Sequence, residues 1–251
     1  MAKTTVYVVR LTRQHLTKLP QAERKWVFFL GHVENEITLL SKLLLWSQRD
    51  PGDQNDLRNV AAVAQGITLA KLLAGKQFEV GNNLRQSYFA SPLRRKYSPL
   101  MRKEAQEAEQ KLESHFAGRN IHYRIRNSFA FHYSLNDIAR EITRAAKTEE
   151  LKMVLSDSHG NTLYDMSEVV ANRAMLATID AQDTRNAIEV FSNAVIDVAG
   201  WYQTFCDGLI EAILRRYWGD DLRKWAGRDV DVQADVFQDI HIPWFFAKAT
   251  Q

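Results

Sequence analysis

The sequence predicts an all-α protein, an antiparallel helical bundle with a small β-hairpin insertion. Two patterns support this fold class. Over several long stretches, apolar residues recur every three or four positions, which is the spacing of one face of a helix. In contrast, residues 151–166 carry two short β-rich runs that flank turn-forming residues, the pattern of a hairpin. We find no internal repeat and no long linker, so we expect a single domain over residues 1–251.

Composition excludes some functional classes and leaves others open. Hydrophobic residues make up 45% of the chain and charged residues 25%, an ordinary globular composition. The net charge is only +3, so a surface that binds nucleic acid would have to be local. Cys206 is the single cysteine, which excludes an internal disulfide and fits a reducing compartment. The longest strongly apolar patch, Trp26–Val33, is far shorter than the ~18 residues of a membrane helix. We expect a cytoplasmic protein without a membrane partner.

The N-terminal quarter predicts an extended segment followed by a long helix. Val6 and Val8 alternate with Tyr7 and Val9 in the first ten positions, which indicates a short strand or an extended arm. Pro20 then stands where a helix would begin. We expect a helix from Gln21 to about Gln48, because apolar residues recur at helical spacing at Trp26, Leu30, Val33, Ile37, Leu40 and Leu44. The run Asp50–Asp53 predicts a break.

Three further helices are predicted before residue 150. The first starts after Asp53 and runs to Leu84 or beyond, with small residues that suit close helix contact and an antiparallel hairpin. Gly75 and Gly81 could bend or interrupt this helix. A charged helix is expected over Pro99–Phe116, with Ser98 as its N-cap. A short helix is expected from Asn136 to about Lys147.

The remainder of the chain predicts the hairpin, one long helix and an aromatic tail. Met153–Leu155 and Thr162–Tyr164 are the two expected strands of the hairpin. A helix is expected from about Asp183 to Trp218. Aromatic side chains are dense in the tail at Ile240–Phe246. Such side chains rarely stay in water, so we expect the tail to pack on the bundle or on a partner.

The most informative segment is Ile125–Tyr133, which places an arginine, an amide and a histidine among apolar and aromatic residues. Arg126 offers a fixed positive fork for phosphate oxygens. His132 carries an imidazole, which exchanges protons near neutral pH. Together they could cut a phosphodiester without a metal. On a straight helix, two residues six positions apart lie about 120° apart around the axis and ~9 Å along it. The alternative is a buried arginine and histidine satisfied by carboxylates inside the bundle.

The run Arg126-Asn127-Ser128-Phe129-Ala130-Phe131-His132 resembles the motif of the HEPN (higher eukaryotes and prokaryotes nucleotide-binding) superfamily. That motif is an Arg, usually followed by a polar residue, and a His after a gap of four to six residues. Here the gap is five and the polar residue is Asn127. The resemblance implies a helical bundle in which the motif follows several long helices, a HEPN-like core over residues 1–150. It does not explain the hairpin at 151–166, nor the long helix and packed tail within 167–251.

The resemblance also implies a function and a mechanism. Many HEPN proteins are metal-independent endoribonucleases that act as homodimers, with motifs from both subunits facing one cleft. By this likeness the chain would be a ribonuclease, such as a toxin or defence effector, that needs no cofactor. His132 would move the proton, Arg126 would stabilise charge on the phosphoryl oxygens, and Asn127 would orient the histidine or the phosphate. The products would carry a 2′,3′-cyclic phosphate and a 5′-hydroxyl.

Two other functions remain open. The chain could be a non-catalytic HEPN-like module that binds nucleotide, RNA or a protein partner, such as an antitoxin or a regulator. It could also be a purely structural bundle in which Arg126 and His132 belong to a buried network. The balanced net charge favours these two readings over an enzyme acting on RNA.

Three residues beside the motif are candidates for substrate binding. His122 and Arg124 could widen a phosphate-binding surface, or they could lie in a solvated turn. Tyr133 could stack a base, or it could pack in the core or in a dimer interface. A metal site is not expected. His32 and Glu36 share a helix face, but no matching Glu-x-x-His pair occurs elsewhere.

Overall fold

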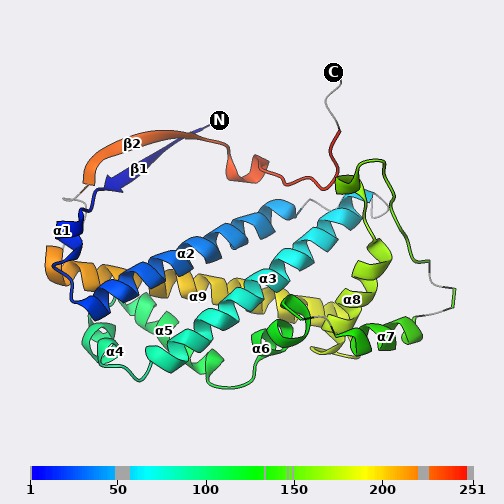
Figure 1. The fold of residues 1–251 in the computed structure, drawn as a ribbon, viewed down its shortest axis with the longest axis horizontal. Coiled ribbons are helices and arrows are strands. Elements are labelled where there is room, and N and C mark those ends of the chain that lie inside the picture. Colours follow the sequence, from blue (N-terminus) through cyan, green and yellow to red (C-terminus); the bar gives the residue numbers. More distant parts are fainter. Residues whose placement is uncertain are drawn as a thin grey trace. The chain divides into compact units, whose positions relative to one another are not determined.

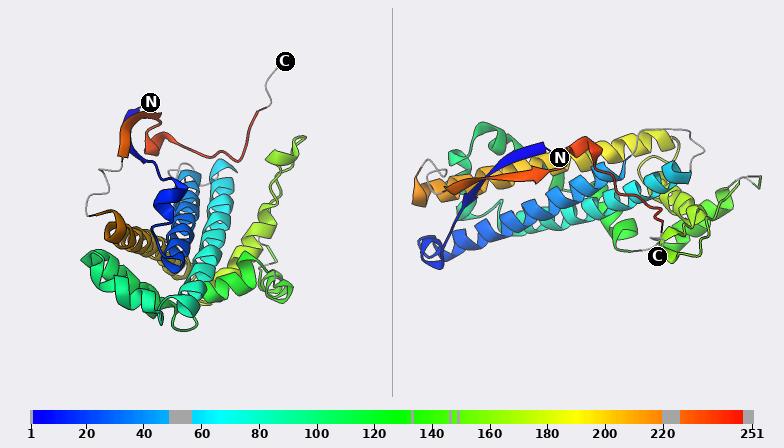
Figure 2. Two further views of the ribbon diagram at one scale, coloured as in Figure 1. Left: turned by 60° about the vertical axis from the view of Figure 1, so that its left-hand side comes forward. Right: turned by 90° about the horizontal axis from the view of Figure 1, so that it is seen from above.

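The computed structural model describes residues 2–48, 57–132, 134–145, 147–148, 150–219 and 226–247. More than half of these residues are helical, which confirms the predicted all-α class with one small β element. Three long helices dominate the chain: α2 (Gln21–Ser47), α3 (Leu57–Ser87) and α9 (Thr184–Trp218) (Figure 1). Within each compact unit, α2 and α3 run in opposite directions (Figure 2). The break predicted at Asp50–Asp53 lies outside the described residues.

The chain divides into two compact units, each assembled from three separate stretches. The first unit comprises Met1–Thr38, Val80–Gly118 and Val198–Ile240, and the second comprises Leu39–Glu79, Arg119–Asp197 and His241–Gln251. The divisions fall inside α2, α3 and α9, so each long helix contributes one segment to each unit. The expected single domain over residues 1–251, with divisions at 150 and 166, stays a prediction.

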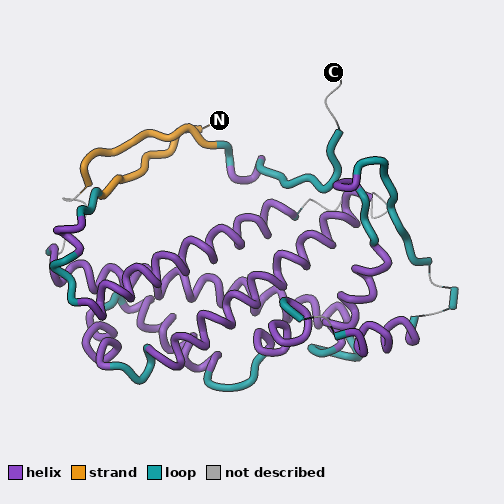
Figure 3. Tube along the Cα trace, in the orientation of Figure 1, coloured by secondary structure: helices purple, strands orange, loops and turns teal. Residues whose placement is uncertain are grey.

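The main β structure pairs the beginning of the chain with a segment near its end. Strand β1 (Ala2–Val9) lies antiparallel to β2 (Ala226–Ala234), with Val6 opposite Val230 (Figure 3). The expected N-terminal strand is therefore confirmed. Its partner is more than 200 positions away, and pairing at that distance leaves no local pattern in a sequence.

The prediction that residues 151–166 hold the main β structure is wrong. That stretch contains one isolated antiparallel bridge, between Val154 and Leu163, and helix α8 (Asp165–Ala177) begins directly after it. Leu163 is buried against Ala61 and Ala64, so the segment is held by packing on α3 rather than by a ladder of strand hydrogen bonds. Short apolar runs on both sides of a turn suit either a hairpin or a loop packed on a helix, so the pattern alone did not separate the two.

The first unit packs around aromatic side chains and a buried carboxylate. It contains the sheet, α1 (Arg13–Leu16), α4 (Pro92–Tyr97) and α5 (Lys103–Phe116). The fully buried rings are Tyr88, Tyr97, Tyr202 and Phe205. Glu109 is only 1% exposed, and its carboxylate accepts hydrogen bonds from the hydroxyls of Tyr88 (2.7 Å) and Ser98 (2.5 Å). The side chain of Ser98 therefore donates to this carboxylate and is not the expected N-cap of a helix. Residues Ser98–Leu100 form a 3-10 turn, and the helix expected from Pro99 begins at Lys103.

The second unit contains α6 (Ile121–Ile125), α7 (Leu135–Arg144) and α8, with segments of the three long helices. Helices α7 and α9 confirm the two predicted over Asn136–Lys147 and Asp183–Trp218. The tail also packs as expected, because Trp244 and Phe245 cover Ala61, Ala64 and Leu163. The backbone N–H of Ile242 donates to the carbonyl oxygen of Trp46 at 3.0 Å, which anchors the tail beside α2. No helix in the described part of the chain is long and apolar enough to cross a membrane.

Candidate active site

The motif lies on a widened helical turn. Helix α6 begins at the cap residue Asn120, whose side-chain oxygen accepts a hydrogen bond from the backbone N–H of Tyr123 at 2.9 Å. After Ile125 the backbone continues as one π-helical turn over Arg126–Ala130. Single π turns inside helices are frequent at functional sites. Phe131 then leaves the helical conformation, so His132 lies beyond the helix end. The angular separation expected for a straight helix does not describe this segment.

One short segment of α3 contacts residues on both sides of Arg126. The rings of Phe78 and Tyr123 meet edge to face with centroids 5.7 Å apart. The ring of Phe131 lies directly over Gly75, where an added Cβ would come within 2.5 Å of its Cε2 atom. Gly75 therefore admits a ring rather than bending the helix, and α3 runs unbroken from Leu57 to Ser87. Two further side chains of this part of α3, Gln77 and Glu79, form hydrogen bonds with His122 and Arg126.

Arg126 is oriented by two oxygen atoms and remains partly open to solvent. Its Nε donates to Glu79 Oε1 at 2.6 Å, and its Nη1 donates to Asn127 Oδ1 at 2.8 Å. The side chains of Arg126 and Glu79 are 32% and 41% exposed. Arg126 makes no other hydrogen bond with the described residues, so its remaining N–H groups stay available to a ligand. The predicted pair of Arg126 and Asn127 is thus brought together by the structure.

His132 stands apart from that pair. Its side chain is exposed and makes no hydrogen bond or ion pair with any residue that the structure describes. The described coordinates also contain no hydrogen bond between His132 and either Arg126 or Asn127. The buried-network alternative therefore does not apply to this histidine. A single copy of the chain presents Arg126 and His132 on neighbouring parts of one segment, with no hydrogen bond between them.

His122 is a core residue, and the expectation that it faces solvent is wrong. Its exposed fraction is 0%, and its Nε2 lies 2.8 Å from Gln77 Oε1. Gln77 in turn donates from Nε2 to the carbonyl oxygen of Val195 at 2.8 Å. The reason is helical periodicity, because His122, Ile125 and Phe129 are spaced as one helix face and all three are buried. In this structure His122 cannot contact a ligand at the protein surface.

The other two binding candidates differ in position. Arg124 is exposed, and its Nη1 donates to the carbonyl oxygen of Thr178 at 2.7 Å, next to the C-terminal end of α8. A cation is favourable at that end of a helix. Tyr133 lies outside the described residues, so its role in stacking a base stays a prediction.

Sequence patterns gave no sign of Glu79 as a site residue, because Glu79 is 47 positions from Arg126 and shares no local pattern with the motif.

The described residues include no group of three or more His, Cys, Asp or Glu side chains arranged to hold a metal ion. His32 and Glu36 do share a face of α2, with Nε2 and Oε2 3.4 Å apart, as expected from their spacing.

Comparisons with protein-family models, with curated proteins and with solved structures find no match for this chain.

Proposed function

We propose that this chain is a metal-independent endoribonuclease of the HEPN type. The observation that carries the proposal is the environment of Arg126, a partly exposed guanidinium held by Glu79 and Asn127 on a π-helical turn. A guanidinium with free N–H groups binds phosphate oxygens in a directed way. The exposed His132 follows on the same segment and supplies a group that can carry a proton. Such an enzyme would act in the cytoplasm, alone or under the control of a protein antitoxin.

The proposed reaction is transfer of a phosphodiester to the neighbouring 2′-hydroxyl. The 2′-oxygen attacks the phosphorus, a new O2′–P bond forms, and the P–O5′ bond breaks. His132 takes the proton of the 2′-hydroxyl or gives one to the departing 5′-oxygen. Arg126 stabilises the negative charge that builds on the phosphoryl oxygens. Asn127 accepts a hydrogen bond from Arg126, so its role is to position the guanidinium rather than the histidine. The products carry a 2′,3′-cyclic phosphate and a 5′-hydroxyl.

The proposal includes a homodimer, because a second copy would bring Arg126 and His132 of two subunits to one cleft. Phe131 and Leu135 flank His132 and are 48% and 75% exposed, which makes this an apolar surface suited to a partner. We expect a dimer by light scattering at micromolar concentration, and Leu135→Arg should shift it to monomer. Leu100→Arg is the control, since Leu100 is 55% exposed in the first unit. A wild-type monomer at high micromolar concentration would remove the composite cleft.

We expect Arg126→Ala to slow RNA cleavage by at least ~100-fold, because one preorganised charge stabiliser is lost. The assay incubates purified protein with an RNA of mixed sequence in EDTA and identifies the ends of the products. Arg124→Ala is the matched control, because Arg124 is a second arginine of the same segment and no step of the proposed reaction uses it. Loss of wild-type activity on chelation, or equal effects of the two substitutions, would contradict the proposed mechanism.

A non-catalytic module that binds nucleotide, RNA or a protein partner is the second candidate. It is favoured by the Glu79 carboxylate, which bonds Arg126 and offsets part of the positive charge that cleavage would need in its transition state. Such a module would bind RNA in EDTA without cutting it, and Arg126→Ala would weaken that binding. The same assay, run with a filter-binding arm, separates the two candidates.

A further inference from the structure

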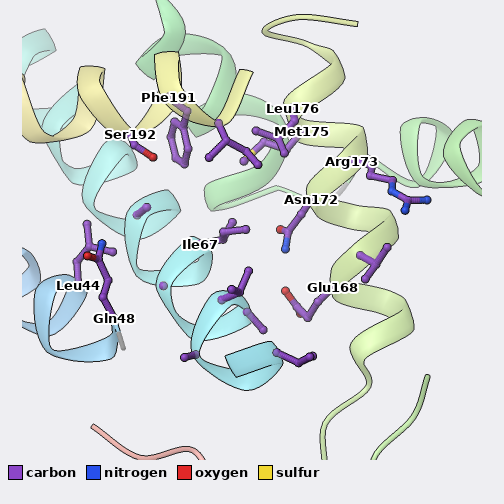
Figure 4. Close-up of a pocket in the computed structure, with 18 of the residues that line it drawn as sticks. Leu44, Gln48, Ile67, Glu168, Asn172, Arg173, Met175, Leu176, Phe191 and Ser192 are labelled. Carbon is purple, nitrogen blue, oxygen red and sulfur yellow. The ribbon is translucent and has the colours of Figure 1, made fainter. Parts of the chain in front are cut away.

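A pocket of about 770 Å³ lies wholly within the second unit, between α3, α8 and α9 (Figure 4). None of its lining residues belongs to the motif segment, so it is separate from the proposed RNA site. Its walls are mainly apolar, with side chains that include Ile67, Met175, Leu176, Phe191 and Val195. A volume of this size is typical of sites for small molecules.

One wall of the pocket carries polar groups whose hydrogen-bonding capacity is only partly used. Glu168 and Asn172 lie one turn apart on α8 and project into the pocket, whereas Arg173 points away (Figure 4). The Oε2 atom of Glu168 is buried and accepts no hydrogen bond from the described residues. Asn172 is only 8% exposed, its Oδ1 accepts from Lys71 Nζ at 3.4 Å, and its amide N–H groups donate to no described residue. A buried oxygen such as Glu168 Oε2 is costly unless something bonds it.

The charges around this wall select against a charged ligand. Lys71 is outside the pocket lining, but its Nζ donates to Asn172 from α3; burial lowers the pKa of Lys71, and the Glu168 carboxylate opposes that shift. The carboxylate of Glu168 repels an anionic head group, and because Lys71 already offsets the charge of that carboxylate, a cationic head group gains little from it. A neutral head group that both donates and accepts hydrogen bonds avoids the repulsion and still uses the polar wall. It can donate to Glu168 Oε2 and accept from the amide of Asn172.

We propose that this pocket binds an amphipathic small molecule with a long apolar body and a neutral head group of the primary-amide type. The body lies against Ile67 and Phe191, and the head reaches Glu168 and Asn172. The exposed rim residues Val63 and Ile196 give the body room to extend towards the opening. This proposal is independent of RNA cleavage, because it uses none of the residues assigned to that reaction.

The test uses the full chain and N-phenyl-1-naphthylamine, a neutral fluorescent probe with one N–H donor. We expect saturable binding of one probe per chain, and displacement by decanamide, decanoate and decylamine in separate arms. Decanamide should compete at a concentration at least ~10-fold lower than decanoate or decylamine, a difference of about 1.4 kcal/mol. Tighter competition by decylamine or decanoate than by the amide would overturn the neutral-head assignment.

Two variants make the test specific to the named residues. Glu168→Gln should remove most of the ~10-fold discrimination against decanoate, because the repelling charge is gone while the shape is kept. Glu189→Gln is the matched control, since Glu189 is exposed on α9 outside the pocket lining and should leave the discrimination unchanged. The proposal fails if the wild type does not bind the probe, or if the head groups compete equally in wild type and Glu168→Gln. It also fails if the chain self-associates through this pocket and thereby excludes the probe. In that case Ile196→Arg would abolish the self-association, and the pocket would be a contact site for a second copy of the chain.

Discussion

Replacing His132 by alanine is expected to abolish RNA cleavage while leaving the fold intact. The reason for the first effect is loss of the group that carries the proton, and general acid–base groups contribute ~10²–10⁴-fold to rates. The reason for the second is that the side chain is exposed and makes no hydrogen bond with the described residues. The measurement is the initial rate of cleavage of a mixed RNA in EDTA, beside a thermal unfolding curve for each protein.

His159→Ala serves as the matched control, because His159 is also an exposed histidine of the second unit and lies outside the motif. It should cut RNA at the wild-type rate. Co-expressing His132→Ala with Arg126→Ala tests the composite cleft, since a mixed dimer retains one copy of each group. Partial recovery of activity in the mixture would support two subunits at one cleft. Activity that survives His132→Ala would contradict the proposed chemistry.

Gly208→Ala is expected to destabilise the protein by ~1–3 kcal/mol, the usual range for an overpacked core. Gly208 is buried on α9 in the first unit, and an added Cβ would come within 2.2 Å of the Cβ of Ala105 on α5. Ala105 is itself 0% exposed and lies within helix α5, so relieving the clash requires the backbone of α5 or α9 to move. The midpoint of thermal or urea unfolding measures the effect.

The control lies on the same helix. Gly200 is exposed, and nothing lies within 4 Å of an added Cβ, so Gly200→Ala should stabilise by roughly 0.5–1 kcal/mol through helix propensity. Ala105→Gly combined with Gly208→Ala should recover part of the lost stability, since the methyl group changes sides without changing the contact. A Gly208→Ala protein as stable as Gly200→Ala would show that α5 and α9 do not approach as closely as described.

The helices were predictable because their signal is local. Apolar spacing was enough to predict α9 within one residue at its start, and to predict α2 and α7 closely. Dense aromatics at the end of the chain were enough to predict a packed tail. The pairing of β1 with β2 was not predictable, because the two strands come together only through tertiary structure. In place of the hairpin expected at 151–166, the structure has one bridge between Val154 and Leu163, and Leu163 is packed in the core.

The candidate site shows the same division. Its residue types and their spacing, Arg126, Asn127 and His132, stand in the sequence itself. The partners that α3 supplies, Gln77 to His122 and Glu79 to Arg126, were decided by tertiary packing. Patterns along a chain report which face of an element is apolar, because neighbours within a turn share that face. Hydrogen-bond partners many positions away depend on which helices pack together and how closely. The tertiary structure alone determines that packing.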